Sequence, residues 1–556
     1  MNCKKVLDNV LVKIGSNIEY LLSRQTEEGT FIQDNPKATN AYDFQIIYPL
    51  AYFYKTKFKG NKYFNDTKIL DALFKIGDYC SAKTNKDGLM YYYSFGNEGY
   101  WLDQRLLIFW LDAYKLIKND LGAKRQKVWA AAIKRSLAHL ENRILGFKSQ
   151  DVFNSYSFNT SPNHSSLYGC ALYLGGKLFE NKKWMAIAEN FMDRFVASQT
   201  NAGYWAEGHG PVGSYCTVSL TGVARVNVEL KKAKYNDSLK KALEYLMKIS
   251  FPDFSLMDVT DRRNGHTKPS PWGLFGLTIT PEGRGFSCKV LESIVKNTPD
   301  ISGEHCARLL EDVVHFKKGD VASYKPWKGT KFLENHSAFV RKGSWQISFS
   351  VMPVVVHPIS SFRLGYGKVF SLWHKKTGVL IDGSQGKNNF EQETFYNANG
   401  ESLGVLYGGQ LHTNLKVPYV EALYSTGLKC AVKSNVISSN EIILSGEQMH
   451  PANSRKGLRF NLPIKTGLGD MIKIGNKKYE LTAKKIKIKL KKGSVVKTHN
   501  GLISFKILCD SVLHFPTFPF NPYTSDNKST IEAAFLRLEL IPKGKPQKAE
   551  VKITIA

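Results

Sequence analysis

The chain has 556 residues, more than a single hydrophobic core usually holds, so we expect two or more domains. Lys and Arg number 77 against 48 Asp and Glu, and this net charge of +29 attracts polyanions such as nucleic acid, an anionic membrane or an acidic polysaccharide. No zinc-finger spacing, RNP-type aromatic motif or basic arm before a heptad occurs, which argues against nucleic acid as a partner. No apolar run approaches about 18 residues, so we expect no membrane span.

The eight cysteines form no CxxC pair. A chain of this length needs no disulfides to hold its core, so we expect most of these cysteines to be buried thiols. The N-terminal stretch MNCKKVLDNVLVKIGSNIEYLL is typical of an amphipathic helix and lacks the clean apolar centre of a signal peptide.

Up to about residue 320 the apolar residues recur at helical spacing. Short turns rich in Gly, Asn and Asp, such as 86–88 and 201–203, join neighbouring segments and indicate consecutive helical hairpins. About ten helices without a TPR or ankyrin repeat favour an (α/α) toroid over 1–320. The helices are predicted over 6–22, 43–54, 69–80, 100–117, 128–144, 165–178, 184–197, 214–230 and 239–249.

From about residue 330 the pattern changes to alternating or β-branched stretches bounded by Gly, Asn and Pro. The stretch 485–490 alternates Lys with apolar residues, as a half-exposed strand does. We therefore predict an antiparallel β-sandwich over 330–556, with the Lys- and Gly-rich stretch 317–329 as the linker. Other strand-like stretches are 344–351, 378–381 and 432–444.

Three short segments combine residue types that can carry chemistry. The first, NTSPNHSSLYG over 159–169, places Asn163 and His164 in the first turn of a helix, because Ser161 and Pro162 look like its N-cap and first residue. A helix N-terminus favours a neutral imidazole that is able to act as a base. The alternative is that Asn163 only caps the helix and that His164 packs against a loop.

The second segment, GYWAEGHGPVGSY over 203–215, holds two aromatic residues before its last tyrosine, a carboxylate, a histidine and four glycines. Glycines permit a ligand to approach the backbone, and functional residues concentrate in loops of this type. Tyr215 opens the following helix, so its phenol can face the same rim as His164. The alternative is an ordinary core tyrosine.

The third segment, LENHSAFVRKGSW over 333–345, begins the predicted sandwich. His336 stands near the domain junction, and clefts between domains commonly bind ligands. Arg341 follows near a hairpin-like turn. A surface histidine in a strand-entry loop is the alternative for His336.

Together these segments resemble the toroid-plus-β-sandwich polysaccharide lyases, the group that includes heparinase II/III-type enzymes and alginate, chondroitin and hyaluronate lyases. In that group an Asn, often followed by His, opens one toroid helix, a Tyr follows later, and several members add a His from the start of the β-domain. Asn163 with His164, Tyr215 and His336 occur in this order. The stretch 393–404 is also similar to the sandwich of such lyases.

The resemblance implies a lyase that cleaves a uronic-acid-containing glycan, acidic and possibly sulfated, by β-elimination. Asn163 would bind the uronate carboxylate and stabilise the enolate-like charge. Tyr215 would be the acid, and also the base when the proton and the leaving group lie on the same side of the sugar. His164 or His336 is the alternative base.

Substrate binding would need aromatic rings that stack on sugars and cations that contact carboxylate or sulfate groups. Trp101 and Arg105 are four residues apart on a predicted helix and would share a face, which could be core edge as easily as cleft. The candidates for stacking are Tyr100, Trp101, Tyr204 and Trp205, and those for anion contacts are Arg105, His209, Arg284 and Arg341.

The resemblance requires no cofactor. His374, Asp382 and His412 are the sandwich residues that would be considered for a structural divalent metal, and their spacing is too loose to assign one. Because polymeric glycans are met outside the cytoplasm, we expect a periplasmic or secreted protein, although no signal peptide is visible. The sequence predicts no particular oligomeric state.

Three rival functions remain. A glycoside hydrolase on the same toroid scaffold would use paired carboxylates, for which the candidates are Asp43, Glu98, Asp103, Glu207, Asp258 and Asp261. A non-catalytic glycan-binding protein would not need the Asn–His, Tyr and His set in this order. A basic scaffold for nucleic acid has only the net charge in its favour and would show salt-sensitive, sequence-independent binding.

Overall fold

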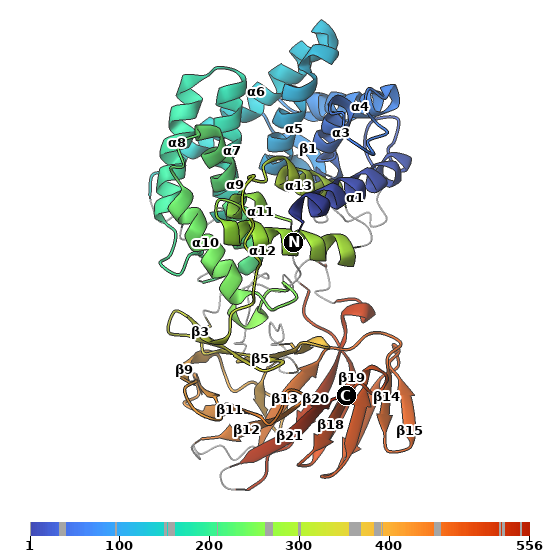
Figure 1. Ribbon diagram of the computed structural model, residues 1–556, viewed down its shortest axis with the longest axis vertical. Coiled ribbons are helices and arrows are strands. Elements are labelled where there is room, and N and C mark those ends of the chain that lie inside the picture. The colour runs from blue at the N-terminus through green and yellow to red at the C-terminus, as the bar shows by residue number, and fades with distance from the viewer. Residues whose placement is uncertain are drawn as a thin grey trace. The chain divides into compact units, whose positions relative to one another are not determined.

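The computed structural model describes residues 2–32, 41–94, 97–149, 153, 162–207, 210–261, 271–298, 302–354, 369–382, 391, 393–449, 457–521, 524, 529–544 and 547–556. The chain divides into two compact units, the first made of Met1–Met247 and Pro269–Lys325, the second of Lys248–Lys268 and Pro326–Ala556. The first is mainly helical and the second is built from antiparallel strands (Figure 1). The predicted fold class, helices first and a β-sandwich second, is confirmed.

The helices of the first unit form a toroid of two layers (Figure 1). α3, α5, α7, α9, α11 and α13 pack side by side in that order, and α13 contacts α3 to close an inner ring. Other helices pack outside it, as α4 does on α3, α8 on α7 and α12 on α11. The elements of this unit are α1 (Cys3–Ser23), α2 (Ala41–Phe44), α3 (Ile47–Lys55), α4 (Thr67–Lys83), β1 (Met90–Ser94), β2 (Asn97–Trp101), α5 (Gln104–Ile117), α6 (Gly122–Gly146), α7 (Pro162–Leu178), α8 (Lys182–Ala197), α9 (Gly213–Leu230), α10 (Asn236–Ile249), α11 (Leu274–Leu277), α12 (Pro281–Asn297) and α13 (Gly303–Val314).

The start of α5 shows how a local signal positions the inner ring. Asp103 caps the helix, because its Oδ1 accepts the backbone N–H groups of Arg105 and Leu106, both at 2.9 Å. The hairpin of β1 and β2 ends just before this cap. The helix predicted over 100–117 is therefore wrong at its start, and Trp101 and Arg105 do not share a helix face.

A buried ion cluster joins three helices of the inner ring. Arg225 of α9 is 1% exposed and donates to Asp112 of α5 at 2.8 Å and to Glu311 of α13 at 3.2 Å. The ring nitrogen Nε2 of His315 lies 2.7 Å from the same guanidinium. Removing one member of a buried ion pair leaves an uncompensated charge and typically costs about 3–5 kcal/mol. The cluster therefore fixes the relative positions of α5, α9 and α13.

A disulfide between Cys3 of α1 and Cys288 of α12 joins two helices that are 285 residues apart in the chain. No pattern in the sequence indicates this pairing. The other cysteines follow the expectation of unpaired thiols, and all except the half-buried last one are buried: Cys80, Cys170, Cys216, Cys306, Cys430 and Cys509.

Two antiparallel sheets make the second unit. One runs in the order β15-β14-β17-β18-β21-β12-β11-β10-β9, and the other runs β16-β19-β20-β13-β7-β6-β5-β4-β3 with β8 beside β13. The strands are β3 (Gly329–Leu333), β4 (Ser337–Lys342), β5 (Trp345–Ser350), β6 (Phe370–His374), β7 (Gly378–Ile381), β8 (Phe395–Asn397), β9 (Leu406–His412), β10 (Tyr419–Tyr424), β11 (Lys429–Val436), β12 (Glu441–Gln448), β13 (Leu458–Ile464), β14 (Met471–Ile474), β15 (Lys477–Glu480), β16 (Ile486–Leu490), β17 (Val495–Thr498), β18 (Ile503–Ile507), β19 (Ser511–Thr517), β20 (Phe535–Leu540) and β21 (Lys548–Ile555).

Alternation along the strands builds the sandwich core. In β20 the side chains of Leu536, Leu538 and Leu540 join the core, while Arg537 between them faces the other side of the sheet. In β16 the alternation read from the sequence is present, with its lysines exposed. The core between the two sheets is therefore assembled from every second residue.

The segment 248–268 belongs to the second unit although toroid helices precede and follow it in the chain. Trp373 of β6 donates to the carboxylate of Asp253 at 2.9 Å, and Arg341 of β4 donates to the carbonyl of Ser250 at 2.9 Å. These bonds, together with the stacking of Phe251 on Trp373, hold the segment against the sheet.

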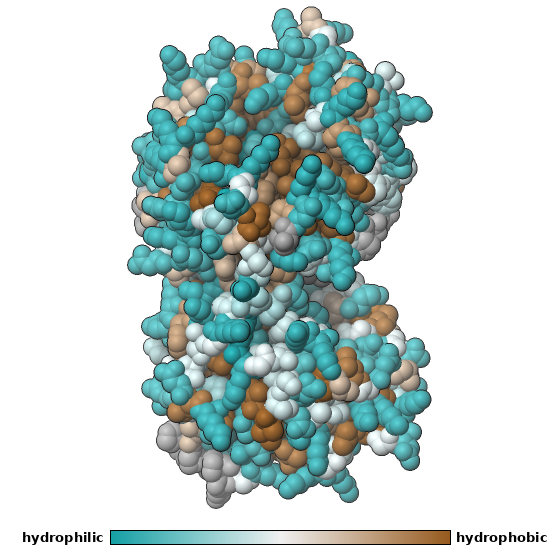
Figure 2. Space-filling model, viewed as in Figure 1, coloured by the Kyte–Doolittle hydropathy of each residue, from teal (hydrophilic) through white to brown (hydrophobic). Residues whose placement is uncertain are grey.

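Hydrophilic residues cover most of the face seen in Figure 2, as the lysine content predicts. Many of these lysines pair with acidic neighbours, for example Lys552 with Glu441 at 2.7 Å. Exposed pairs of this kind contribute little to stability. Among the described helices, none combines the length and the apolar character that crossing a membrane needs.

The buried ion cluster predicts a pH-dependent stability. Burial, working against the attraction of Arg225, raises the pKa of Glu311 to about 7. Between about pH 4.5 and about pH 7 the folded toroid therefore keeps a proton that the unfolded chain releases, so its stability falls as the pH rises through this window. Glu311→Gln removes the titration, and its melting temperature should fall less than that of the wild type.

Between about pH 5 and about pH 8 the wild type should lose about 1–3 kcal/mol more stability than Glu311→Gln. Calorimetry measures this as the difference between their thermal midpoints. Glu292→Gln, at a half-exposed acid of α12, is the matched control and should keep the wild-type pH dependence. Parallel curves for the wild type and Glu311→Gln would contradict the assignment.

The disulfide predicts a thiol count and a stability loss. The denatured, unreduced protein should react at six of its eight cysteines and the reduced protein at all eight. Cys3→Ser should lower the free energy of unfolding by about 2–5 kcal/mol, because the unfolded chain loses a constraint. Cys509→Ser, in the second unit, should change neither the pairing nor the melting of the toroid.

Candidate active site

Predicted catalytic residues meet where the inner helices begin. Asn163 and His164 lie in the first turn of α7, and Tyr215 lies in the first turn of α9. Gln104, the first residue of α5, has its Nε2 2.8 Å from Nδ1 of His164, so the starts of α5 and α7 are adjacent. Helix N-termini carry partial positive charge, and their convergence makes this end of the toroid favourable for an anion.

Asn163 is fully buried and faces a carboxylate. Its Nδ2 donates to Oε2 of Glu207 at 3.3 Å, and Glu207 itself is 6% exposed. Among the described residues, the carbonyl oxygen Oδ1 of Asn163 has no hydrogen-bond partner. Buried amide oxygens are rarely left without a donor, and those that are need an explanation such as a ligand or a catalytic role.

The loop that carries Glu207 depends on Gly203. This glycine has φ +97°, and a Cβ there would lie 2.1 Å from the carbonyl oxygen of Lys241. The backbone N–H of Glu207 donates to the carbonyl of Gly210 at 2.9 Å and closes a turn. The glycines therefore bring the loop close to α10 and deliver the carboxylate to Asn163.

Arg105 supplies the positive charge of the site. Burial disfavours its charged form, but Glu304, Tyr42, Asp103 and Tyr215 outweigh that effect and raise the pKa of Arg105. The guanidinium is 3.7 Å from the carboxylate of Glu304. The phenol of Tyr215 is thus close enough to Arg105 for the two groups to interact electrostatically.

A second guanidinium shares the same carboxylate. Arg308 of α13 forms an ion pair with Glu304 and, like Arg105, packs against the ring of Trp272. The Nε atoms of Arg105 and Arg308 are buried and have no hydrogen-bond partner in the part of the chain that the structure describes. Burial raises the pKa of the neighbouring Tyr42 to about 12, so this phenol stays neutral.

The aromatic candidates for sugar stacking separate into two pairs. Tyr100 and Trp101 are 52% and 44% exposed on the hairpin of β1 and β2, so their rings are accessible. Tyr204 and Trp205 are buried; Trp205 stacks on Phe195 with ring centres 5.3 Å apart, and Tyr204 packs on a tyrosine of α10. The buried pair serves the packing of the toroid, which argues against a stacking role.

Two arginines proposed for anion contacts are engaged in the fold. Arg284 is buried and donates to the carbonyls of Thr278 at 2.8 Å and Asp320 at 2.5 Å. Arg341 donates to the carbonyls of Trp327 and Ser250 at 3.0 and 2.9 Å. These bonds argue against a substrate contact for either residue.

Two histidines outside α7, His209 and His336, were also predicted as site residues. His209 lies outside the described residues. His336 belongs to the second unit, where its Nδ1 is 2.9 Å from Oγ of Ser337 and its Nε2 is 2.9 Å from the carboxylate of Glu334. The contacts of His336 are therefore those of the strand-entry loop before β4.

Of the carboxylates considered for hydrolysis, Glu207 accepts a hydrogen bond from a predicted catalytic side chain, that of Asn163. Asp103 caps α5, and Asp43 accepts the backbone N–H of Gly303 at 3.2 Å. Glu98 accepts the phenol of Tyr91 on the hairpin. The remaining two, Asp258 and Asp261, are buried in the second unit.

No three His, Cys, Asp or Glu side chains come together to hold a metal within the described residues. His374 is buried, with its Nε2 3.0 Å from the carbonyl of Ser439, and His412 stacks on Tyr419. These two histidines of the sandwich are thus engaged by neighbours of their own.

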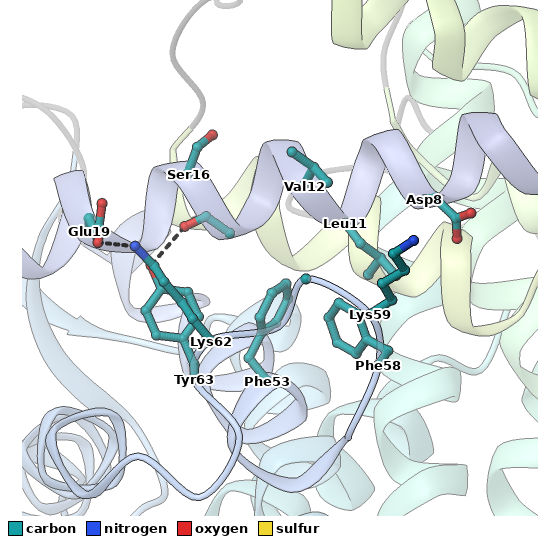
Figure 3. A pocket seen from close by; sticks show the side chains of 12 residues that line it. Asp8, Leu11, Val12, Ser16, Glu19, Phe53, Phe58, Lys59, Lys62 and Tyr63 are labelled. Carbon is teal, nitrogen blue, oxygen red and sulfur yellow. Dashed lines mark hydrogen bonds and ion pairs between the residues drawn. The ribbon is translucent and has the colours of Figure 1, made fainter.

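A hollow of about 290 Å³ lies beside α1 (Figure 3). Phe53, Phe58 and Tyr63 line it, and Lys62 forms an ion pair with Glu19 at its edge. None of the predicted catalytic residues lines this hollow, so it is distinct from the site at the starts of the inner helices.

No protein-family model matches the chain, and no curated protein matches it significantly. The chain has the fold of the toroid-plus-β-sandwich polysaccharide lyases, which confirms the resemblance at the level of the fold. A Streptomyces coelicolor A3 chondroitin AC lyase in complex with chondroitin sulphate is 10% identical, with a TM-score of 0.54 over 98% of this chain and 96% of that chain. A point mutant of that lyase is 12% identical, with a TM-score of 0.55 over 98% of this chain and 79% of that chain.

The buried contact between Asn163 and Glu207 predicts the effect of a second carboxylate. Asn163→Asp would set two like charges side by side, which disfavours the ionised form of both. At about pH 8 this variant should unfold at a lower temperature than Asn163→Ala, by the equivalent of about 1–3 kcal/mol. The gap should shrink towards about pH 5, where the pair can share a proton.

Asn227→Asp is the matched control, because Asn227 is a buried toroid amide that faces another amide, Asn236, at 3.0 Å. Its melting temperature should depend less on pH. Equal melting temperatures for Asn163→Asp and Asn163→Ala at both pH values would show that Glu207 does not face Asn163.

Proposed function

We propose that the protein is a polysaccharide lyase that cleaves an acidic, uronic-acid-containing glycan by β-elimination. The observation that carries this proposal is the meeting of Asn163, His164 and Gln104 at the starts of α5 and α7, with Tyr215 near the charge of Arg105. The fold shared with a chondroitin AC lyase supports it.

β-Elimination has three requirements: neutralisation of the uronate carboxylate, removal of the C5 proton and protonation of the leaving oxygen. The amide of Asn163 is suited to the first, because hydrogen bonds to the carboxylate stabilise the charge that develops when C5 loses its proton. The electron pair of the C5–H bond becomes the C4–C5 double bond, and the C4–O bond breaks. The glycosidic oxygen then takes a proton and leaves as a hydroxyl.

Tyr215 is the residue that we assign to proton transfer. Negative charge that develops on its oxygen is stabilised by the nearby guanidinium of Arg105. When the C5 proton and the leaving oxygen lie on the same side of the sugar, one side chain serves both: as a phenolate it takes the proton from C5, and as the resulting phenol it gives that proton to the leaving oxygen.

The helix N-termini and the two guanidinium groups of the site favour an anionic substrate, and Glu304, Asp103 and Glu207 balance part of their charge. Arg105 and Arg308 share one carboxylate, Glu304, and several helix N-termini point to the same end. The exposed rings of Tyr100 and Trp101 offer stacking surfaces. The disulfide fits a protein that works in an oxidising compartment, the periplasm or the outside of the cell.

The test is ultraviolet absorbance of the unsaturated product during incubation with chondroitin sulphate, heparan sulfate, hyaluronan and alginate. We expect a rise with at least one of them, because β-elimination creates a double bond conjugated with the carboxylate. Tyr215→Phe should lower the rate by at least about 10²-fold, since the phenol carries the proton. Tyr407→Phe, at a tyrosine 69% exposed in the second unit, is the control. Full activity in Tyr215→Phe would contradict the assignment.

A glycoside hydrolase is the second candidate, and the buried carboxylate of Glu207 beside Asn163 is the observation that favours it. Hydrolysis produces new reducing ends without the absorbance of a double bond. New ends with a flat absorbance trace, abolished by Glu207→Gln, would therefore replace the lyase with a hydrolase.

A further inference from the structure

We propose that Gln104 fixes the tautomer of His164 and makes this histidine a hydrogen-bond donor to the substrate carboxylate rather than the base. The tautomer follows from the structure of the toroid. The role towards substrate rests on the proposed lyase function.

The contact joins two rigid helix starts. Gln104 is 2% exposed at the first position of α5, held there by the Asp103 cap on the same turn. His164 is half-buried at the third position of α7, with the ring of Tyr168 one turn further along at 6.3 Å. Nε2 of Gln104 and Nδ1 of His164 are 2.8 Å apart, which is a good hydrogen-bond distance.

The chemistry of the two groups gives the contact a direction. In the structure the amide of Gln104 is oriented with its nitrogen towards the imidazole; an amide nitrogen only donates hydrogen bonds, so in this orientation Nδ1 of His164 accepts. A neutral imidazole carries a single N–H, which is then at Nε2. If Nδ1 were protonated, two N–H groups would face each other across 2.8 Å in a buried contact. Gln104 therefore selects the tautomer with the proton on Nε2.

This tautomer decides between the two chemical roles open to His164. A base needs a nitrogen lone pair directed at the C5 proton, and the lone pair of Nδ1 is occupied by Gln104. The Nε2–H group is a donor and suits an oxygen of the uronate carboxylate. Asn163 and His164 both lie in the first turn of α7, where the partial positive charge of the helix N-terminus favours a bound carboxylate. Proton transfer then falls to Tyr215.

Gln104 is thus a positioning residue: it acts through His164 and needs no contact with substrate. The hydrogen bond that a neighbouring side chain makes to one nitrogen of a histidine decides which of the two nitrogens carries the proton. A glutamate in its place would accept a hydrogen bond instead of donating one. Gln104→Glu therefore reverses the tautomer while keeping the size of the side chain.

The experiment is nitrogen-15 NMR of the full-length protein labelled at histidine, at a pH where imidazoles are neutral, with the signals of His164 identified by their loss in His164→Gln. We expect Nε2 to appear as the protonated nitrogen and Nδ1 as the unprotonated one. In Gln104→Glu the two should exchange character. In Gln104→Leu, which does not donate, the preference should weaken towards a mixture.

Gln199→Glu is the matched control, because Gln199 is a half-buried toroid glutamine that donates to the carbonyls of Gly203 and Ser238. It should leave the signals of His164 unchanged. A wild-type spectrum with the proton on Nδ1, or an unchanged tautomer in Gln104→Glu, would overturn the inference.

Activity separates this inference from the proposed function. On a polysaccharide that the wild type cleaves, Gln104→Glu should lower kcat/KM by about 10–100-fold, because the donor to the carboxylate is lost. A flat absorbance trace for the wild type would refute the lyase and leave the tautomer standing. An active lyase whose His164 carries the proton on Nδ1 would refute the inference alone.

Discussion

The buried charge of Arg225 is the interaction on which the geometry of the site depends. It holds Asp112 of α5 and Glu311 of α13 to α9, deep in the inner ring. The same three helices carry Arg105, Tyr215 and the pair Glu304–Arg308 near their first turns. A guanidinium without solvent cannot exchange its carboxylates for water, so each helix has one axial position relative to the others. The ion pairs of Arg225, which lie further along the helices, therefore set the distances between the side chains at the helix starts.

The topology of the toroid brings the N-termini of several inner helices, with their partial positive charges, to one end of the ring. Alternation between inner and outer helices makes successive inner helices run in the same direction, and several dipoles then end at one place. Mobile surface lysines account for much of the charge of +29, but they are screened by salt and by acidic partners. The fixed charges at the starts of the inner helices are those of the helix ends, Arg105 and Arg308, with Glu304 between the two arginines.

Local signals in the sequence predicted most of the fold. Ser161 and Pro162 predicted the start of α7 and therefore placed Asn163 and His164 in its first turn. The two-residue alternation of 485–490 predicted β16. At the start of α5, by contrast, the apolar residues Tyr100 and Trp101 extended the predicted helix backwards and concealed both the hairpin and the cap at Asp103. Gln104 contacts His164, which is 60 residues away in the chain, and Cys3 pairs with Cys288, which is 285 residues away. Periodicity cannot reveal such meetings, because they arise from packing.

The disulfide from Cys3 to Cys288 links the first helix of the toroid covalently to α12. Nearly the whole toroid lies inside one covalent loop. A protease that cuts any exposed turn between these two residues would leave both fragments attached, with the inner ring still packed around its buried charges. Outside the cell, where peptide bonds are under constant attack, such a molecule would be nicked well before it came apart.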